Sequence, residues 1–196
     1  TVQGTVGITG EKKLDLYVDT KKIRAEALSG WIDMDTKLTG NLDNRLHVTG
    51  TLDQPVLNGE YELRDGSFGS LLIAGSSGKY SLDDKGFHIE DMRVSSLNTE
   101  VELKGDITPS RDIDLRIRAV DVEIERLYLD MPYAIIGRAT FYGKLEGSLD
   151  SPMFKGAVRS NGLDFNGTVL KDIKGNVTVR NKVLTIPEFS FSEGDG

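Results

Sequence analysis

Apolar and polar residues alternate with a period of two along most of this chain. In residues 46–53 (LHVTGTLD), apolar residues or glycine hold the even positions, and histidine, threonine and aspartate hold the odd ones. A period of two is typical of a β-strand that buries one face and exposes the other to water. The same alternation recurs from residues 14–18 to residues 189–191, so the chain is predicted to be all-β.

The apolar positions of these strands are the candidate lining of one shared surface. Side chains two residues apart along a strand lie on the same face of the sheet. The residues predicted to form this surface are Leu46, Val48, Leu52, Leu57, Tyr61, Leu63, Tyr80, Leu82, Phe87, Ile89, Val101, Leu103, Ile113, Leu115, Ile117, Phe141, Leu145, Leu149, Phe165, Val177, Val179, Leu184 and Ile186.

No long helical pattern is available to cover that surface. All-parallel sheets are covered on both faces and read as continuous apolar runs, so the alternation favours a mostly antiparallel sheet. Its apolar face has two ways to leave water. It can line a strongly curved, open sheet as an apolar trough, which is the prediction, or it can be buried in a closed β-sandwich or a β-solenoid, which is the alternative.

Several segments carry local signals. Residues 21–34 (KKIRAEALSGWIDM) combine good helix formers with alternation, which predicts a strand or a single helical turn. Turns are predicted at RDGS (64–67), DDKG (83–86) and RNK (180–182) because Gly, Asp and Asn favour tight turns. The serines at positions 76, 77, 95 and 96 are predicted to lie in turn-like polar patches. A further strand is predicted to contain Val122 and Ile124.

One stretch of twelve residues occurs twice. Residues 48–59 read VTGTLDQPVLNG, and residues 145–156, 97 positions later, read LEGSLDSPMFKG. The apolar register is kept around both copies, which predicts an internal duplication. The chain is therefore expected to be a single continuous β segment of 196 residues, with repeats over roughly 1–99 and 100–196.

The repeated stretch has a structural interpretation. Proline removes a donor from a strand ladder and aspartate favours turns, so the motif is predicted to join two strands. Four of its glycines fall on the apolar parity, at positions 50, 59, 147 and 156. Either they relieve crowding in tight packing, or they shape an open groove.

Composition narrows the possible partners. The 24 Lys and Arg residues are dispersed among 31 Asp and Glu residues, giving a net charge of −7, so nucleic acid is not an expected partner. Without cysteine, disulfides and thiolate metal sites are excluded. The longest aliphatic run, residues 71–74, is far shorter than the roughly 20 residues of a membrane-spanning helix. The chain starts and stops inside strand-like patterns, and we expect it to be a segment of a longer polypeptide.

Candidate catalytic and metal-binding groups are few. His47 and His88 are the two histidines, and both fall on the polar parity of their strands, where solvated side chains are expected. Acidic groups occur at positions 33 and 35, 83 and 84, and 121, 123 and 125, without the spacing of a calcium loop. We therefore expect no enzyme activity, no metal and no cofactor.

The repeated motif also carries a resemblance to a known family. Residues 50–55 (GTLDQP) with Gly59, residues 65–68 (DGSF), and residues 147–152 (GSLDSP) with Gly156 resemble the C-terminal region of the TamB family, in the AsmA-like superfamily. The second copy departs from this pattern, since it reads SNGLDF where the first has the Asp-Gly pair. In style the resemblance extends over nearly the whole chain.

That resemblance implies a curved sheet with an apolar trough, often called a β-taco. It implies a segment of an inner-membrane-anchored protein in the periplasm of a diderm bacterium, with the anchor outside these residues. The implied role is non-enzymatic: sheltering phospholipid acyl chains for transport between the inner and outer membranes, or assisting outer-membrane protein assembly beside a TamA-like barrel partner. Two alternatives remain open: a structural or adhesin-like protein-interaction module, and a chaperone that pairs with outer-membrane protein strands by β-augmentation.

Overall fold

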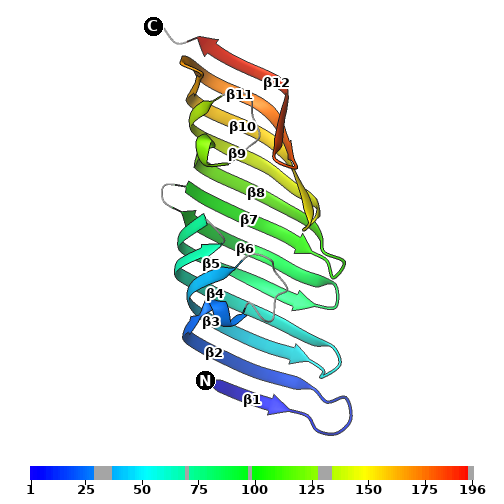
Figure 1. Ribbon diagram of the computed structural model, residues 1–196. Coiled ribbons are helices and arrows are strands. Elements are labelled where there is room, and N and C mark those ends of the chain that lie inside the picture. The colour runs from blue at the N-terminus through cyan, green and yellow to red at the C-terminus, as the bar shows by residue number, and fades with distance from the viewer. Residues whose placement is uncertain (29–36, 69–70, 97–98, 128–133, 194–196) are drawn as a thin grey trace. The chain divides into compact units, whose positions relative to one another are not determined.

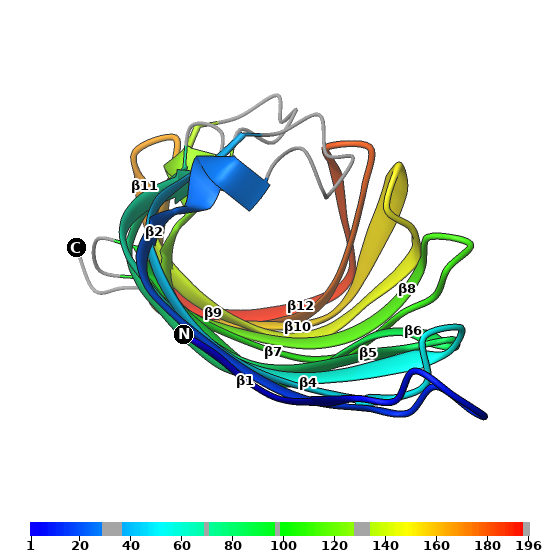
Figure 2. The same cartoon turned by 90° about the horizontal axis from the view of Figure 1, so that it is seen from below.

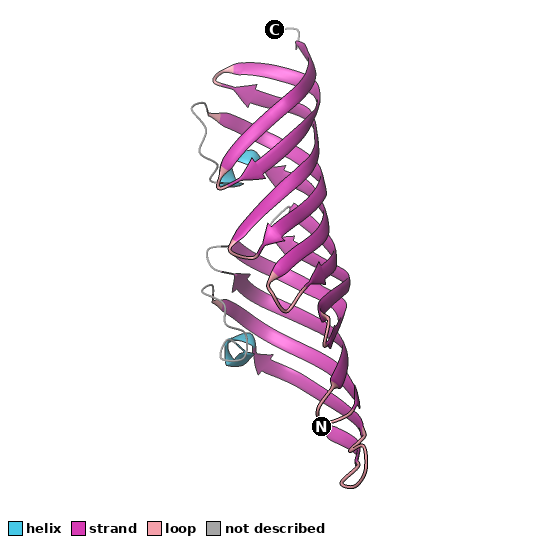
Figure 3. Ribbon diagram, turned by 90° about the vertical axis from the view of Figure 1, so that its right-hand side faces the viewer, coloured by secondary structure: helices cyan, strands magenta, loops and turns pink. Residues whose placement is uncertain are grey.

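The computed structural model describes residues 1–28, 37–68, 71–96, 99–127 and 134–193. Within these ranges the chain consists of strands and two short 3-10 helices, as Figures 1 and 3 show. The 3-10 helices are η1 (Ala25–Leu28) and η2 (Ile124–Leu127). The strands are β1 (Val2–Val6), β2 (Leu14–Arg24), β3 (Leu38–Gly50), β4 (Pro55–Phe68), β5 (Leu71–Asp83), β6 (Gly86–Ser96), β7 (Thr99–Ile107), β8 (Asp112–Glu123), β9 (Ile135–Ser148), β10 (Ser151–Phe165), β11 (Thr168–Arg180) and β12 (Val183–Glu193).

The strand order of the sheet is the chain order, from β1 to β12, and it does not return to its start. The chain divides into two compact units, which are described separately. Unit 1 comprises Thr1–Leu97 and Asp106–Pro109, and unit 2 comprises Asn98–Gly105 and Ser110–Gly196. Strands β1 to β6 of unit 1 pair antiparallel with their chain neighbours, as do β8 to β12 of unit 2. The predicted all-β, antiparallel, open sheet is confirmed, and the described residues form neither a closed sandwich nor a solenoid.

The same elements follow one another in both units. In unit 1, β2 leads through η1 to β3–β6, and in unit 2, β8 leads through η2 to β9–β12. Residues 21–24 are the end of β2, and η1 is a single 3-10 turn, so this part of the segment 21–34 is both strand and helical turn. Residues 29–34 of that segment lie outside the described residues. The duplication itself stays a prediction.

Each unit has a concave face, and its 3-10 helix lies on that side of the strands in Figure 2. In unit 1, Ala25 of η1 is fully buried against Leu42, Leu63 and Ile73. In unit 2, Ile124 of η2 belongs to the buried cluster of Ala139, Val158, Leu163, Ile173 and Val177. The apolar side chains therefore lie on the concave face of each unit.

β-Bulges give these strands their bends. Register shifts interrupt the ladder between β2 and β3, β3 and β4, β8 and β9, and β9 and β10. Asp65, Asp121 and Asp172 adopt left-handed backbone angles, with φ of 52°, 54° and 51°. Aspartate tolerates this conformation better than most residues. A bulge bends its strand and increases the local twist, which curves a sheet that would otherwise lie flatter.

The repeated motif forms the hairpin between two strands, as predicted. Gly50 ends β3 opposite Pro55, and Gly147 near the end of β9 lies opposite Pro152. Both glycines have positive φ, 83° and 100°, a region that other residues rarely occupy. The hairpin turns predicted at residues 83–86 and 180–182 are also present.

Other predictions from local signals are wrong. The RDGS segment lies inside β4, where Asp65 makes a bulge, so the Asp-Gly pair bends a strand and does not reverse the chain. The four serines lie within β5 and β6, and Ser76 and Ser96 are buried. Ile124 belongs to η2 instead of a strand. A bulge accommodates Asp65 inside its strand, and hydrogen bonds accommodate Ser76, Ser95 and Ser96 inside theirs.

Candidate functional site

The concave face of unit 1 is built from rows of side chains that lie opposite one another on neighbouring strands. Residues paired across an antiparallel ladder have their side chains on the same face. One continuous row is entirely apolar and crosses five strands: Leu16, Val48, Leu57, Leu82 and Phe87. The next row contains Val18, Leu46, Gly59, Tyr80 and Ile89. A further row contains Ile23, Leu42, Leu63, Ser76 and Val94.

The concave face of unit 2 repeats this construction. Its continuous apolar row is Leu115, Leu145, Phe154, Val179 and Leu184. Ile113 lies opposite Gly147. In the next row, Ile117 lies opposite Gly143, Gly143 opposite Gly156, and Gly156 opposite Val177. Phe141 pairs with Val158 and packs edge-on against Phe154. Most of the predicted surface residues are thus brought together within their own units.

A few predicted residues lie elsewhere. Leu52 and Leu149 lie in the turns between β3 and β4 and between β9 and β10, and both are exposed. Ile186 is on β12 with 36% of its surface exposed, and Phe165, at the end of β10, packs edge-on against Phe189. On β7, Val101 and Leu103 are half-buried. Leu52 and Leu149 lie beyond the strands and therefore do not extend the rows.

The structure also adds residues that the candidate surface lacks. Leu16, Val18, Leu42, Phe154, Val158 and Ile173 belong to the concave faces described above. Leu16 and Val18 follow the same alternation and were recognisable from it. Ile173 lies in the polar sequence KDIKG, but it has the same parity as Val177 and Val179, and its pairing with Ser160 places it on the apolar face with them.

Aromatic rings lie against two glycines of the repeated motif, Gly59 and Gly156. A Cβ added at Gly59 would lie 2.3 Å from Cζ of Tyr80, so the Tyr80 ring lies directly against the Gly59 backbone. In unit 2, a Cβ at Gly156 would lie 2.9 Å from Cζ of Phe154. Of the two roles considered for these glycines, close packing under a ring is the one observed at positions 59 and 156.

The concave faces keep access to solvent. In the described part of the chain, each unit has a single layer of strands and one short 3-10 helix, so no second sheet covers its apolar rows. Leu82 is 39% exposed, while its row neighbours Val48, Leu57 and Phe87 are half-buried. Apolar surface of this kind is a common mark of a binding surface when it is contiguous.

The opposite face of unit 1 is polar. Charged residues pair across the strands there, as in the ion pairs of Glu60 with Lys79 (2.9 Å) and Asp43 with Arg64 (3.2 Å). Each such exposed pair contributes little to stability, because water and salt screen its charges. Their principal effect is to keep this face well hydrated.

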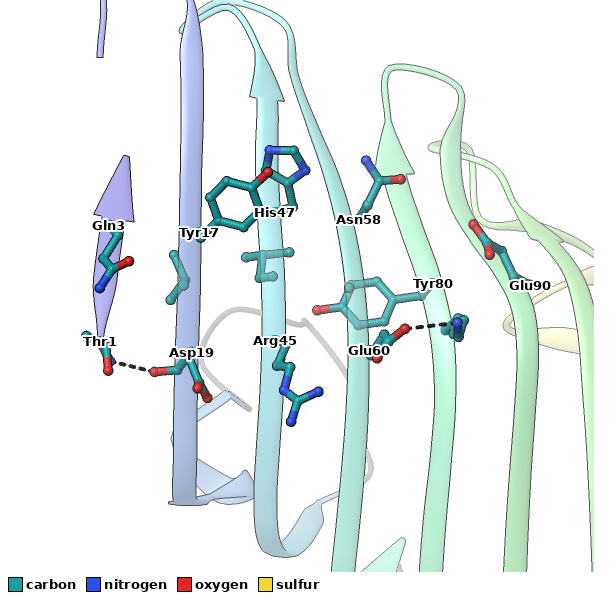
Figure 4. Close-up of a pocket in the computed structure, with 14 residues that line it drawn as sticks. Thr1, Gln3, Tyr17, Asp19, Arg45, His47, Asn58, Glu60, Tyr80 and Glu90 are labelled. Atoms are coloured by element: carbon teal, nitrogen blue, oxygen red, sulfur yellow. Dashed lines mark hydrogen bonds and ion pairs between the residues drawn. The ribbon is translucent and has the colours of Figure 1, made fainter. Parts of the chain in front are cut away.

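A hollow of about 600 Å³ lies on unit 1 between β1 and β6 (Figure 4). The Tyr17 ring stacks on His47 with a centroid distance of 4.1 Å, and Nε2 of His47 lies 2.8 Å from Oδ1 of Asp15. Asp19, Arg45, Glu60 and Lys79 contribute both signs of charge to the lining. A mixture of both charges is typical of a solvated sheet surface, and it gives the hollow no preference for an anionic or a cationic ligand.

His88 connects the ends of three strands in unit 1. Its Nδ1 lies 2.7 Å from Oδ1 of Asp106 on β7, and its Nε2 lies 3.0 Å from Oδ1 of Asp83 at the end of β5. The hydrogen bond with Asp106, followed by the one with Asp83, raises the pKa of His88 above its usual 6.5. The same hydrogen bond with His88 is the main reason that the pKa of Asp83 is lowered. His88 therefore forms hydrogen bonds with two carboxylates, whereas the sequence predicted a solvated side chain.

The contribution of His88 to the stability of unit 1 should therefore decrease as the pH rises above the usual histidine pKa of 6.5. A histidine whose pKa is raised by folding stabilises the folded state fully below its unfolded pKa, and this contribution disappears as the pH rises through the folded value. Urea unfolding of the wild type and of His88→Gln should differ more at pH 6 than at pH 9. Asp106→Asn should reduce the pH dependence, because it removes the main cause of the shift. Equal differences at both pH values would contradict this assignment.

The acidic groups of the sequence serve local contacts. Glu123 forms ion pairs with Arg126 and with Arg138, and Glu125 accepts a hydrogen bond from the backbone N–H of Gly137. Asp83 is held by His88 and the Lys85 backbone, and positions 33 and 35 lie outside the described residues. Within the described ranges, no group of three or more His, Cys, Asp or Glu residues is arranged to hold a metal ion.

Comparisons with known proteins give no relatives for this chain. No family model matches it, and neither a curated protein nor a solved structure matches it significantly. None of the helices in the described residues has the length and apolar character to span a membrane. The candidate function therefore rests on the concave faces themselves.

Proposed function

We propose that this chain is a non-enzymatic lipid-sheltering segment, which holds the acyl chains of phospholipids on its concave apolar faces. The observation that carries the proposal is the continuous apolar row in each unit, from Leu16 to Phe87 and from Leu115 to Leu184, on a face that no second sheet covers in the described residues. An acyl chain is long, flexible and purely apolar, which matches a row without polar interruptions.

The energetics of burial support this occupant. Transfer of a methylene group out of water contributes about 0.8 kcal/mol, so one ordinary acyl chain gains on the order of 10 kcal/mol before ordering costs. The polar opposite face, with its paired charges, keeps the protein dissolved while the other face is apolar. The resemblance to the TamB family agrees with this role, and it extends the proposal to phospholipid transport between membranes in the periplasm, or to outer-membrane protein assembly beside a TamA-like partner.

Lipid recovered with the purified protein tests the proposal. The chain, expressed in the periplasm of a diderm bacterium and purified without detergent, should carry phospholipid that mass spectrometry detects after solvent extraction. Leu82→Arg in unit 1 and Leu184→Arg in unit 2 should together lower the recovered lipid by about tenfold, since a charge in an acyl-chain site is strongly unfavourable.

Ser77→Arg is the matched control, because Ser77 is an exposed residue of β5 that lies between Glu62 and Arg93 on the polar face. It adds the same charge to the same strand and should leave the recovered lipid unchanged. Absence of phospholipid from the wild type would overturn the proposal. So would equal amounts of lipid in the wild type and in the variant with both concave-face arginines.

A further inference from the structure

A line of polar side chains crosses the otherwise apolar concave face of unit 1. It consists of Thr20, Asn44, Tyr61, Ser76 and Tyr80, and we call it the polar belt. Thr20 lies opposite Asn44, and Asn44 lies opposite Tyr61, so these three share the concave face with the apolar rows on either side. Ser76 lies opposite Leu63, and Tyr80 lies opposite Gly59, on that same face.

Hydrogen bonds join the members of the belt in two groups. The Tyr80 hydroxyl donates to Oδ1 of Asn44 (3.2 Å), and the Tyr61 hydroxyl lies 2.8 Å from Oγ of Ser76. Thr20 Oγ1 donates to the backbone carbonyl of Asn44 (3.2 Å). Tyr61 is half-buried, and this burial raises the pKa of its hydroxyl. The belt is thus an ordered group of polar atoms in an apolar setting.

One donor of the belt is unused within the described residues. Oδ1 of Asn44 accepts from Tyr80, whereas none of the hydrogen bonds among the described residues uses Nδ2 of Asn44. Asn44 is half-buried, and its amide nitrogen is not among the buried atoms that lack a partner, so it is reachable from outside. A primary amide can donate two hydrogen bonds. A ligand with a hydrogen-bond acceptor could therefore accept a hydrogen bond from Nδ2 of Asn44.

Unit 2 lacks the belt at the structurally equivalent positions. Ala119 pairs with Phe141 as Thr20 pairs with Asn44, and Phe141 pairs with Val158 as Asn44 pairs with Tyr61. The positions that match Ser76 and Tyr80 are Ile173 and Val177, which lie opposite Ser160 and Gly156. The polar side chains of the belt are therefore a property of unit 1 alone and not a requirement of the fold.

We propose that the polar belt of unit 1 binds the ester-linked glycerol part of a lipid, with the Asn44 amide donating to an ester carbonyl, while unit 2 holds acyl chains only. None of the five side chains is charged at neutral pH, so the belt suits a neutral acceptor, whereas a phosphate would lie there without a cation. The belt lies between apolar rows, as an ester linkage lies next to acyl chains. This inference rests on the proposed function and specifies which part of the lipid unit 1 recognises.

A pair of lipids that differ only in the linkage tests it. Two phosphatidylcholines with matched unsaturated chains, one with ester and one with ether linkages, are compared for displacement of a fluorescent acyl probe from the full chain. The ether lipid lacks the carbonyl acceptors, so the wild type should bind the ester lipid about three- to tenfold more tightly, as expected for one or two hydrogen bonds. Asn44→Leu and, separately, Tyr80→Phe should reduce this preference toward one.

Tyr17→Phe is the control, because it removes a hydroxyl from the polar face of the same unit and should keep the preference. Tyr80→Phe changes one atom only, which keeps the test informative if Asn44→Leu is poorly folded by circular dichroism. Equal affinity for the two lipids would overturn the belt assignment and leave acyl-chain sheltering intact. A preference that survives both belt variants would also overturn it. Failure of both lipids to displace the probe would count against acyl-chain sheltering as well.

Discussion

Replacing Ile173 with alanine should lower the free energy of unfolding of unit 2 by about 3 kcal/mol. Ile173 is 1% exposed and is the largest of the fully buried side chains among the described residues. It belongs to the cluster of Val158, Leu163 and Val177 that packs with Ile124 of η2. Truncation of a buried isoleucine to alanine typically costs about 2–5 kcal/mol, because it removes apolar contacts and leaves a cavity. Urea unfolding followed by circular dichroism measures the change.

Ile136→Ala provides the control for this prediction. Ile136 is on β9 of the same unit and is 54% exposed, so the same atoms are removed where few neighbours surround them. Its effect should stay within about 1 kcal/mol. If the two variants lost equal stability, η2 and the buried cluster would not be the core of unit 2.

Replacing Gly156 with alanine should destabilise unit 2 by about 2 kcal/mol. A Cβ at this position would lie 2.1 Å from the carbonyl oxygen of Tyr142 and 2.7 Å from Cα of Gly143 on β9. Both atoms belong to the backbone and cannot rotate away, so β9 and β10 would have to separate locally. Overpacking of this kind costs about 1–3 kcal/mol. The free energy of urea unfolding again provides the measurement.

Gly162→Ala is the matched substitution on the same strand. The nearest atom to a Cβ there is the Leu170 carbonyl oxygen at 3.8 Å, which is an ordinary contact, and no positive φ is involved. This variant should be neutral or slightly stabilising, because alanine restricts the unfolded chain more than glycine does. If the Gly156→Ala and Gly162→Ala variants were equally stable, the backbones of β9 and β10 would not lie as close together as in the structure.

Much of the fold could be predicted from the alternation of the sequence. Leu82 and Phe87 lie on either side of the DDKG turn, and the period of two placed both on one face, where the structure pairs them. Ile73 could not be placed in this way. It has the opposite parity to Tyr80 and Leu82, yet it is buried with Leu42 and Leu63, because it pairs with Gly66 beyond the bulge at Asp65.

The bulge at Asp65 also explains why the turn predicted at residues 64–67 is absent. The Asp-Gly pair at 65–66 has the composition of a turn, and Asp65 does adopt a left-handed backbone angle. The chain nevertheless continues as one strand, because β4 pairs with β3 and with β5 both before and after this pair. Asn44 shows how much of the candidate site the sequence alone can predict. Its parity with Leu42 and Leu46 was visible, yet its hydrogen bond to Tyr80, 36 residues away, depends on the registers of three strands.

The chain-order pairing within each unit also bears on how the protein folds. Because the described strands pair mainly with their immediate chain neighbours, most contacts close short loops, and such local contacts favour rapid folding. Each hairpin can form on the edge left by the one before it, so the sheet can grow stepwise as the chain emerges during synthesis. The same pairing allows the sheet to become longer or shorter by whole hairpins. Inserting or removing one hairpin would change the area of an apolar face without disturbing the pairing of distant strands.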